Sequence, residues 1–141
     1  MQINMSISKS KPLLMVKNLV KYFKNPNSNF FANDKWIKAV DGVTFDIYPG
    51  ETVGIVGESG CGKSTLGRTI AGLYKPDSGK IFFLGDDLLK ISERSRKKLT
   101  KKMQIIFQDP AGSLNPRRTI LETLMDPFSI HNLYEKTKRK K

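Results

Sequence analysis

Eight residues near the middle of the chain, Gly57 to Ser64, read G-E-S-G-C-G-K-S. Their three glycines allow backbone turns that a Cβ atom would resist. An apolar run, residues 51–57, leads into them, and residues 64–74 follow with apolar side chains at helical spacing. The pattern predicts a strand buried on both faces, a tight turn and a helix that begins beside the lysine. These three elements together indicate an α/β fold around the glycine-rich turn.

The turn matches the phosphate-binding pattern G-x-x-x-x-G-K-[ST], known as the P-loop. Glycine turns point successive backbone N–H groups inward, and the start of the following helix adds the positive end of its dipole. We expect Lys63 to reach the β- and γ-phosphates of a nucleotide, Ser64 to coordinate Mg²⁺, and Thr65 to add a phosphate contact. The candidate nucleotide-binding residues in this segment are Gly57, Glu58, Ser59, Gly60, Cys61, Gly62, Lys63, Ser64 and Thr65.

Cys61 lies inside this loop, close to a predicted helix N-terminus and to Lys63. Such surroundings favour a thiolate, so one hypothesis is that thiol modification blocks nucleotide binding. The alternative is a side chain that only packs within the loop. A single cysteine excludes an internal disulfide framework and a cysteine-based zinc site. Together with the lack of an apolar run of ~18 residues, this favours a reducing, cytoplasmic compartment.

The chain is strongly basic, with 25 lysine and arginine residues against 13 acidic residues. Ten of its twelve net positive charges lie in two runs, residues 90–102 and 135–141. The rest of the chain is therefore almost neutral, which weakens a nucleic-acid reading of the net charge. We interpret each run as a solvated helix face or tail, with binding to nucleic-acid phosphates or to an anionic membrane surface as the alternatives.

Strand patterns account for most of the remaining apolar segments, which are residues 13–23, 36–50, 80–89 and 103–110. The last of these is a second buried-strand candidate, and Asp109-Pro110 stops it. Residues 92–102 contain few apolar side chains, so any helix there is expected to be exposed. Residues 120–128 predict a short helix that ends near Pro127, because proline interrupts helical hydrogen bonding.

Three longer stretches resemble the ATP-binding subunits of ABC transporters, most closely the oligopeptide and dipeptide importer branch. They are KAVDGVTFDIYPGETVGIVGESGCGKSTLGRTI, KPDSGKI and MQIIFQDPAGSLNPR, and the likeness covers residues 13–130. It implies a P-loop NTPase fold of the α/β class, here the N-terminal portion of an ABC-type nucleotide-binding domain with its β-rich subdomain and P-loop core. The implied organisation is a flexible N-terminus at 1–11, a partial ATP-binding domain at 12–130, and a basic tail at 131–141 where the helical subdomain begins.

The resemblance implies roles for residues outside the P-loop. Gln108 matches the family's Q-loop glutamine, which would complete the Mg²⁺ coordination and sense the γ-phosphate. The segment Gln108–Arg117 would dock on transmembrane permease subunits. Phe23 best matches the aromatic residue that stacks on adenine, with Tyr22 as the neighbouring candidate and a packing role for Phe23 as the alternative.

The same resemblance implies ATP and Mg²⁺ as cofactors and a second ATP-binding subunit as the partner in a homo- or heterodimer. It implies a peripheral place on the cytoplasmic side of the cell membrane, with no direct contact to nucleic acid. Other subunits would then select the transported solute.

The 141 residues contain no LSGGQ signature, no Walker B carboxylate pair and no switch histidine. Residues 81–87 resemble Walker B only superficially, because Gly85 interrupts the apolar run, and His131 comes too early for the switch. We therefore expect a truncated chain that binds ATP without turning it over. Strands without their partners would leave apolar surface and sheet edges uncovered. The alternatives are a non-catalytic gene remnant or regulatory fragment, and a soluble ABC-type ATPase acting on nucleic acid.

Overall fold

The computed structural model describes residues 11–26, 35–109, 112, 114–131 and 133. The N-terminus expected at 1–11 and the basic tail expected at 131–141 lie almost entirely outside these described residues. The chain divides into two compact units, Met1–Arg96 and Lys97–Lys141, and each is described by itself.

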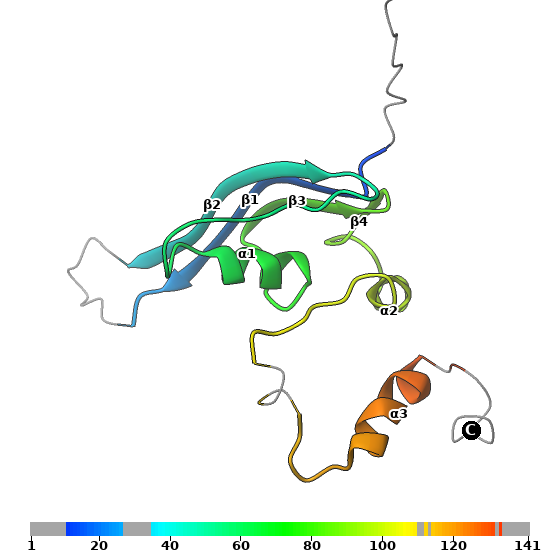
Figure 1. The fold of residues 1–141 in the computed structure, drawn as a ribbon. Coiled ribbons are helices and arrows are strands. Elements are labelled where there is room, and N and C mark those ends of the chain that lie inside the picture. The colour runs from blue at the N-terminus through cyan, green and yellow to red at the C-terminus, as the bar shows by residue number, and fades with distance from the viewer. Residues whose placement is uncertain (1–10, 27–34, 110–111, 113, 132, 134–141) are drawn as a thin grey trace, which may run out of the picture. The chain divides into compact units, whose positions relative to one another are not determined.

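The first unit contains most of the regular structure (Figure 1). Its elements, in chain order, are β1 (Leu14–Lys24), β2 (Trp36–Ile47), α1 (Lys63–Ile70), β3 (Ser78–Phe83) and β4 (Asp86–Asp87). The boundary between the units falls within α2 (Glu93–Thr100), and the second unit contains α3 (Ile120–Ile130). Strand predictions for 13–23, 36–50 and the start of 80–89 are thereby confirmed.

The strands form one antiparallel sheet in the order β2-β1-β3-β4. β1 is central, and its Val16 lies opposite Phe45 of β2 and Ile81 of β3. The register shifts after Val16, where one extra residue of β1 makes a bulge. Asn18 takes a φ of 46° there, and the Thr44 side-chain oxygen accepts from its backbone N–H at 2.8 Å. The bulge explains why the buried positions pass from Leu14 and Val16 to Leu19 instead of keeping strict alternation.

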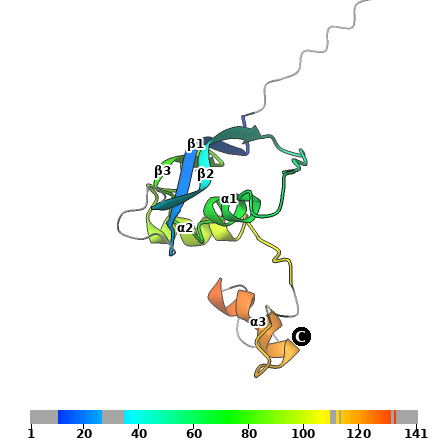
Figure 2. The ribbon, with the colours of Figure 1, turned by 90° about the vertical axis from the view of Figure 1, so that its left-hand side faces the viewer.

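The core of the first unit is small and lies between the sheet and α1. α1 contacts β1 and β2 and lies on one face of the sheet (Figure 1, Figure 2). It contributes Leu66 and Thr69, and the Thr69 hydroxyl is satisfied by the Thr65 carbonyl at 2.7 Å. The buried apolar side chains of the described residues are Leu14, Val16, Leu19, Val40, Leu66, Ile81 and Phe83.

The two buried strands expected at 51–57 and 103–110 are wrong for this structure. Both segments have irregular backbone, and no strand of the described residues pairs with either of them. Val56 is 96% exposed and Ile106 is 91% exposed. A strand is held by hydrogen bonds to a neighbouring strand, so apolar side chains without such a neighbour do not form one. Apolar side chains are therefore exposed along both segments.

The helices begin near their predicted positions but end differently. α1 stops at Ile70, before the predicted end at 74, and Gly72 follows it with a φ of 79°. Among the α2 side chains that the structure describes, Leu99 is half-buried and the others are exposed, as expected. α3 continues past Pro127 to Ile130, and the His131 N–H then donates to the Pro127 carbonyl at 3.0 Å. No helix in the described ranges combines the length and the apolar character that a membrane crossing requires.

Candidate phosphate-binding site

The glycine-rich turn leads directly into α1, as the sequence predicted. Gly62 is the residue before the helix and has a φ of 97°. No side chain caps this end of α1, and no acidic side chain lies in its first turn. The first backbone N–H groups of a helix have no partner within it, and they carry the positive end of the dipole. The loop therefore presents an uncapped, electropositive helix start.

The turn is packed against β2 at Gly62. A Cβ atom added at this glycine would lie 1.9 Å from the Ala39 carbonyl oxygen. No side chain fits at that distance, so the close approach of loop and strand requires glycine here. The contact fixes the start of α1 relative to the sheet.

The Lys63 ammonium lies inside the loop and binds its backbone. It donates to the Gly57 carbonyl at 2.7 Å and to the Glu58 carbonyl at 2.6 Å, and it lies 3.5 Å from the Cys61 sulfur. Carbonyl oxygens are neutral acceptors, and hydrogen bonds between ionised partners are stronger. Phosphate oxygens are therefore better partners for this ammonium than the loop carbonyls.

The remaining predicted loop residues lie around Lys63. Glu58, Ser59, Gly60 and the free thiol of Cys61 are exposed. Ser64 is exposed in the first turn of α1, directly after the lysine, and Thr65 is half-buried. The structure thus brings the whole set from Gly57 to Thr65 together in one loop and helix start.

A cavity of about 430 Å³ lies beside the loop, within the first unit. Its walls are mainly apolar, and the charged residues Lys63, Lys38 and Asp41 also line it. The apolar lining comes from β2, from the irregular segment before the loop and from α1, namely Ala39, Val40, Val43, Phe45, Val53, Ile55, Val56 and Leu66.

Phe23 and Tyr22 lie in different surroundings at the end of β1, since successive strand side chains point to opposite faces. The Phe23 ring is half-buried, with its centroid 5.4 Å from that of Tyr74. The Tyr22 hydroxyl donates to Asp41, whose carboxylate is also 3.5 Å from the Lys38 ammonium. The hydrogen bond to Asp41 raises the pKa of Tyr22, and the same bond lowers the pKa of Asp41.

Gln108 belongs to the second unit, where it is exposed in irregular backbone. The role of Gln108 in Mg²⁺ coordination therefore stays a prediction. Of the Gln108–Arg117 segment, residues 110, 111 and 113 lie outside the described residues. Two local bonds order the rest: Asp109 Oδ1 accepts from the Gly112 N–H at 2.9 Å, and Asn115 Oδ1 accepts from the Arg117 N–H at 3.0 Å.

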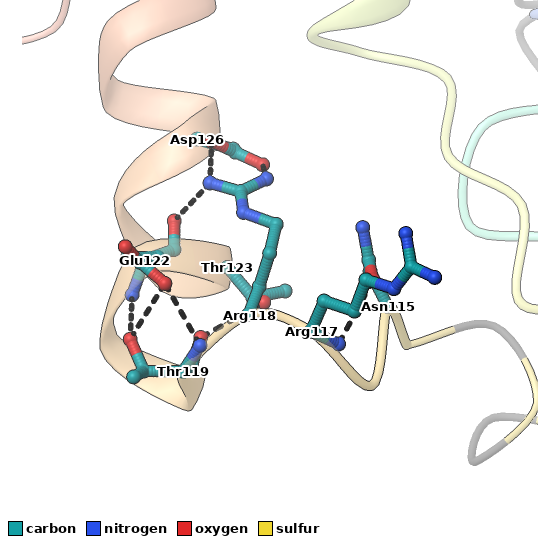
Figure 3. Close-up of polar contacts among 7 residues, drawn as sticks. All are labelled: Asn115, Arg117, Arg118, Thr119, Glu122, Thr123 and Asp126. Carbon is teal, nitrogen blue, oxygen red and sulfur yellow. Dashed lines mark hydrogen bonds and ion pairs between the residues drawn. The ribbon is translucent and has the colours of Figure 1, made fainter.

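The start of α3 carries a polar cluster that we did not predict from the sequence (Figure 3). Thr119 and Glu122 form a reciprocal capping box, and the Arg118 guanidinium holds both carboxylate oxygens of Asp126. These contacts lower the pKa of Glu122, first through the Thr119 backbone N–H, and lower that of Asp126 through Arg118. The T-x-x-E spacing at 119–122 was the signal available in the sequence.

Comparison with known proteins assigns the family. The family model described as ABC transporter matches residues 40–141, which is most of the chain. This chain belongs to the ABC transporter family. The resemblance seen in the sequence is thereby confirmed, and so is the fold class.

Relatives in the ABC family include peptide-transport proteins. The chain is 46% identical to the oligopeptide transport ATP-binding protein AppF of Bacillus subtilis over 136 residues, which are 96% of this chain and 41% of that protein. It is 41% identical to the dipeptide transport ATP-binding protein DppF of Escherichia coli, over 92% of this chain and 39% of that protein. The chain thus spans about two-fifths of the length of these ABC relatives.

A solved ABC structure supports the same fold. A dimeric bacterial ABC transporter cassette matches with a TM-score of 0.68 and 26% identity, over 89% of this chain and 52% of that one. The same cassette in a post-hydrolysis state, bound to ADP and phosphate, matches with a TM-score of 0.67.

Proposed function

We propose that this chain is the ATP-binding part of an ABC importer for oligopeptides or dipeptides. One observation carries the proposal: the Lys63 ammonium lies inside a glycine-rich loop at the uncapped start of α1. The names of the relatives support ATP as the nucleotide and peptides as the transported class.

When the loop binds a triphosphate, the Lys63 ammonium exchanges its hydrogen bonds to loop carbonyls for hydrogen bonds to phosphate oxygens. Phosphate oxygens take over the Lys63 ammonium from the Gly57 and Glu58 carbonyls. Backbone N–H groups of the loop and of the first turn of α1 donate to the same phosphates. Ser64, next to the lysine, supplies its hydroxyl to Mg²⁺, which offsets the charge of the phosphates when it is bound.

Two residues outside the loop complete the proposed site. Phe23 provides an aromatic face for the adenine ring, and its half-buried position at the end of β1 leaves part of the ring accessible. Gln108 would complete the Mg²⁺ coordination beside the γ-phosphate of the bound nucleotide. The proposal for Gln108 rests on the family resemblance of the segment MQIIFQDPAGSLNPR.

The permease contact is proposed for the segment Gln108–Arg117 and the α3 helix that follows it. Leu114 is 53% exposed, and α3 buries none of its residues. Exposed apolar side chains favour contact with another protein. We also propose a second ATP-binding subunit as a partner, which the dimeric cassette supports. The transporter relatives support a peripheral place on the cytoplasmic side of the membrane.

For these 141 residues by themselves we propose ATP binding without turnover. The sequence holds no Walker B carboxylate pair and no LSGGQ segment. Phosphoryl transfer depends on positioned charges around the metal and the attacking water, which the Walker B carboxylates would supply. Sustained Mg-ATPase activity of the pure chain contradicts this part of the proposal.

The test of the loop is calorimetric titration of the chain with Mg-ATP. We expect Lys63→Ala to weaken binding at least about tenfold, because it removes a charged hydrogen bond to phosphate. Lys80→Ala is the matched control, since Lys80 is an exposed lysine of β3 in the same unit. The Lys80→Ala variant should bind Mg-ATP with the affinity of the unmodified chain. Equal affinity in the Lys63 and Lys80 variants refutes the proposed site.

A further inference from the structure

The segment that follows α1, Tyr74 to Asp77, is attached to the last residues of β1. The Asp77 N–H donates to the Val20 carbonyl at 2.9 Å, and the Asp77 carboxylate accepts from the Tyr22 N–H at 2.6 Å. The Lys21 ammonium lies 3.3 Å from the same carboxylate. These contacts join residues more than fifty positions apart in the chain, so the segment has a defined place beside β1.

Phe23 is in contact with two side chains of this attachment. Its ring and that of Tyr74 meet at an interplanar angle of 80°, with centroids 5.4 Å apart, which is a favourable edge arrangement. The Lys21 ammonium lies 5.3 Å from the Phe23 centroid, over the ring. Because Asp77 holds Lys21, this cation is itself fixed. One face of Phe23 is thus covered by Lys21, and the ring also packs against Tyr74.

Tyr74 is in turn tied to the helix that the phosphate-binding loop begins. Its N–H donates to the Arg68 carbonyl at 3.3 Å, and its hydroxyl accepts from the Arg68 guanidinium at 3.4 Å. α1 starts at Lys63 and contains Arg68, so a continuous set of contacts runs from the loop through α1 to Tyr74 and the Phe23 ring.

We propose that Tyr74 is a positioning residue for the nucleotide base: it holds the Phe23 ring in the orientation in which the face opposite Lys21 stacks on adenine. The inference rests on the proposed ATP site and deepens it. A side chain that is ordered before the ligand arrives spares part of the entropy lost on binding, so fixing Phe23 strengthens base binding. The phosphates would bind at the loop and not at this pair of rings, so we expect their affinity to be unchanged when Tyr74 is replaced.

The experiment compares two ligands on the full chain, Mg-ATP and Mg-tripolyphosphate, by calorimetric titration. Tripolyphosphate has the phosphates of ATP but no base. We expect Tyr74→Ala to weaken ATP binding by about two- to tenfold, the range of one aromatic pair, and to leave tripolyphosphate binding unchanged. Tyr74→Phe keeps the ring and should bind ATP like the unmodified chain. Tyr48→Ala removes an exposed tyrosine elsewhere in the same unit and is the matched control.

A double variant shows whether the effect passes through Phe23. With Phe23→Ala already present, Tyr74→Ala should cause no further loss of ATP affinity, because the ring that it orients is gone. Equal weakening of ATP and tripolyphosphate by Tyr74→Ala overturns the proposal, since it indicates general damage to α1 and the loop. Unchanged or stronger ATP binding overturns it too. If the unmodified chain binds tripolyphosphate but gains nothing from the base, the inference fails while the phosphate site stands; if it binds neither ligand, both fail.

Discussion

The packing of the loop against β2 leads to a sharp prediction about two glycines. Gly60 and Gly62 lie two residues apart and have φ values of 81° and 97°. A Cβ at Gly60 meets nothing within 4 Å, whereas a Cβ at Gly62 lies 1.9 Å from the Ala39 carbonyl oxygen. Alanine at either position must adopt a positive φ, which is unfavourable for a residue with a Cβ atom. Only alanine at Gly62 also collides with the sheet. The pair therefore separates backbone strain from steric exclusion.

The magnitudes follow from this geometry. A left-handed conformation costs a residue with a Cβ roughly 1–2 kcal/mol, and Gly60→Ala should lower the free energy of unfolding by about that amount. Ordinary van der Waals contact begins at 3.4 Å, so Gly62→Ala needs a displacement of about 1.5 Å between loop and strand. Backbone shifts forced by overpacking add roughly 1–3 kcal/mol. The total expected for Gly62→Ala is then about 2–5 kcal/mol.

The assay is urea unfolding of each variant, followed by far-ultraviolet circular dichroism and by the fluorescence of Trp36, the single tryptophan of the chain. Titration with Mg-ATP on the same samples reports the effect on the loop itself. If the two variants lose the same free energy of unfolding, the Ala39 contact does not control the position of the loop, and the steric role given to Gly62 is refuted.

Two further predictions concern the second unit and the pH dependence. Thr119→Ala breaks the capping box of α3 and should speed amide hydrogen exchange in its first turns about fivefold, equivalent to ~1 kcal/mol. Thr123→Ala, in the same helix, loses only a bond to the Thr119 carbonyl and should change exchange little; equal effects would argue against the cap. The pKa of Asp77 is lowered from its ordinary 3.8, first by the hydrogen bond from the Tyr22 N–H and then by Lys21. The ionised Asp77 carboxylate therefore stabilises the fold above pH 3.8. That contribution is lost as the pH falls through the lower pKa of the folded state. Acid titration of the unfolding free energy should therefore be flatter below pH 3.8 for Asp77→Asn, and an unchanged profile would contradict the assignment.

The local features of this chain were readable from its sequence. The turn from Gly57 to Ser64 and the helix after it depend on glycine conformations and helix-start chemistry, which neighbouring residues specify. The long strands β1 and β2 followed from their apolar patterns in the same way. The capping box at Thr119 is equally local, and its T-x-x-E spacing was present in the sequence although we did not predict the cap from it.

Contacts between distant segments were decided by the tertiary structure alone. Residues 51–57 and 103–110 have the composition of buried strands, yet they form no ladder, because a strand requires a partner that its own sequence does not specify. The Asn18 N–H in the bulge donates to Thr44, and the Phe23 ring packs against Tyr74, and both partners lie far away in the chain. The sequence by itself therefore determined the glycine-rich loop and the family of the chain, since these are properties of adjacent residues. The tertiary structure determined what surrounds that loop, because packing partners are fixed only when remote segments meet.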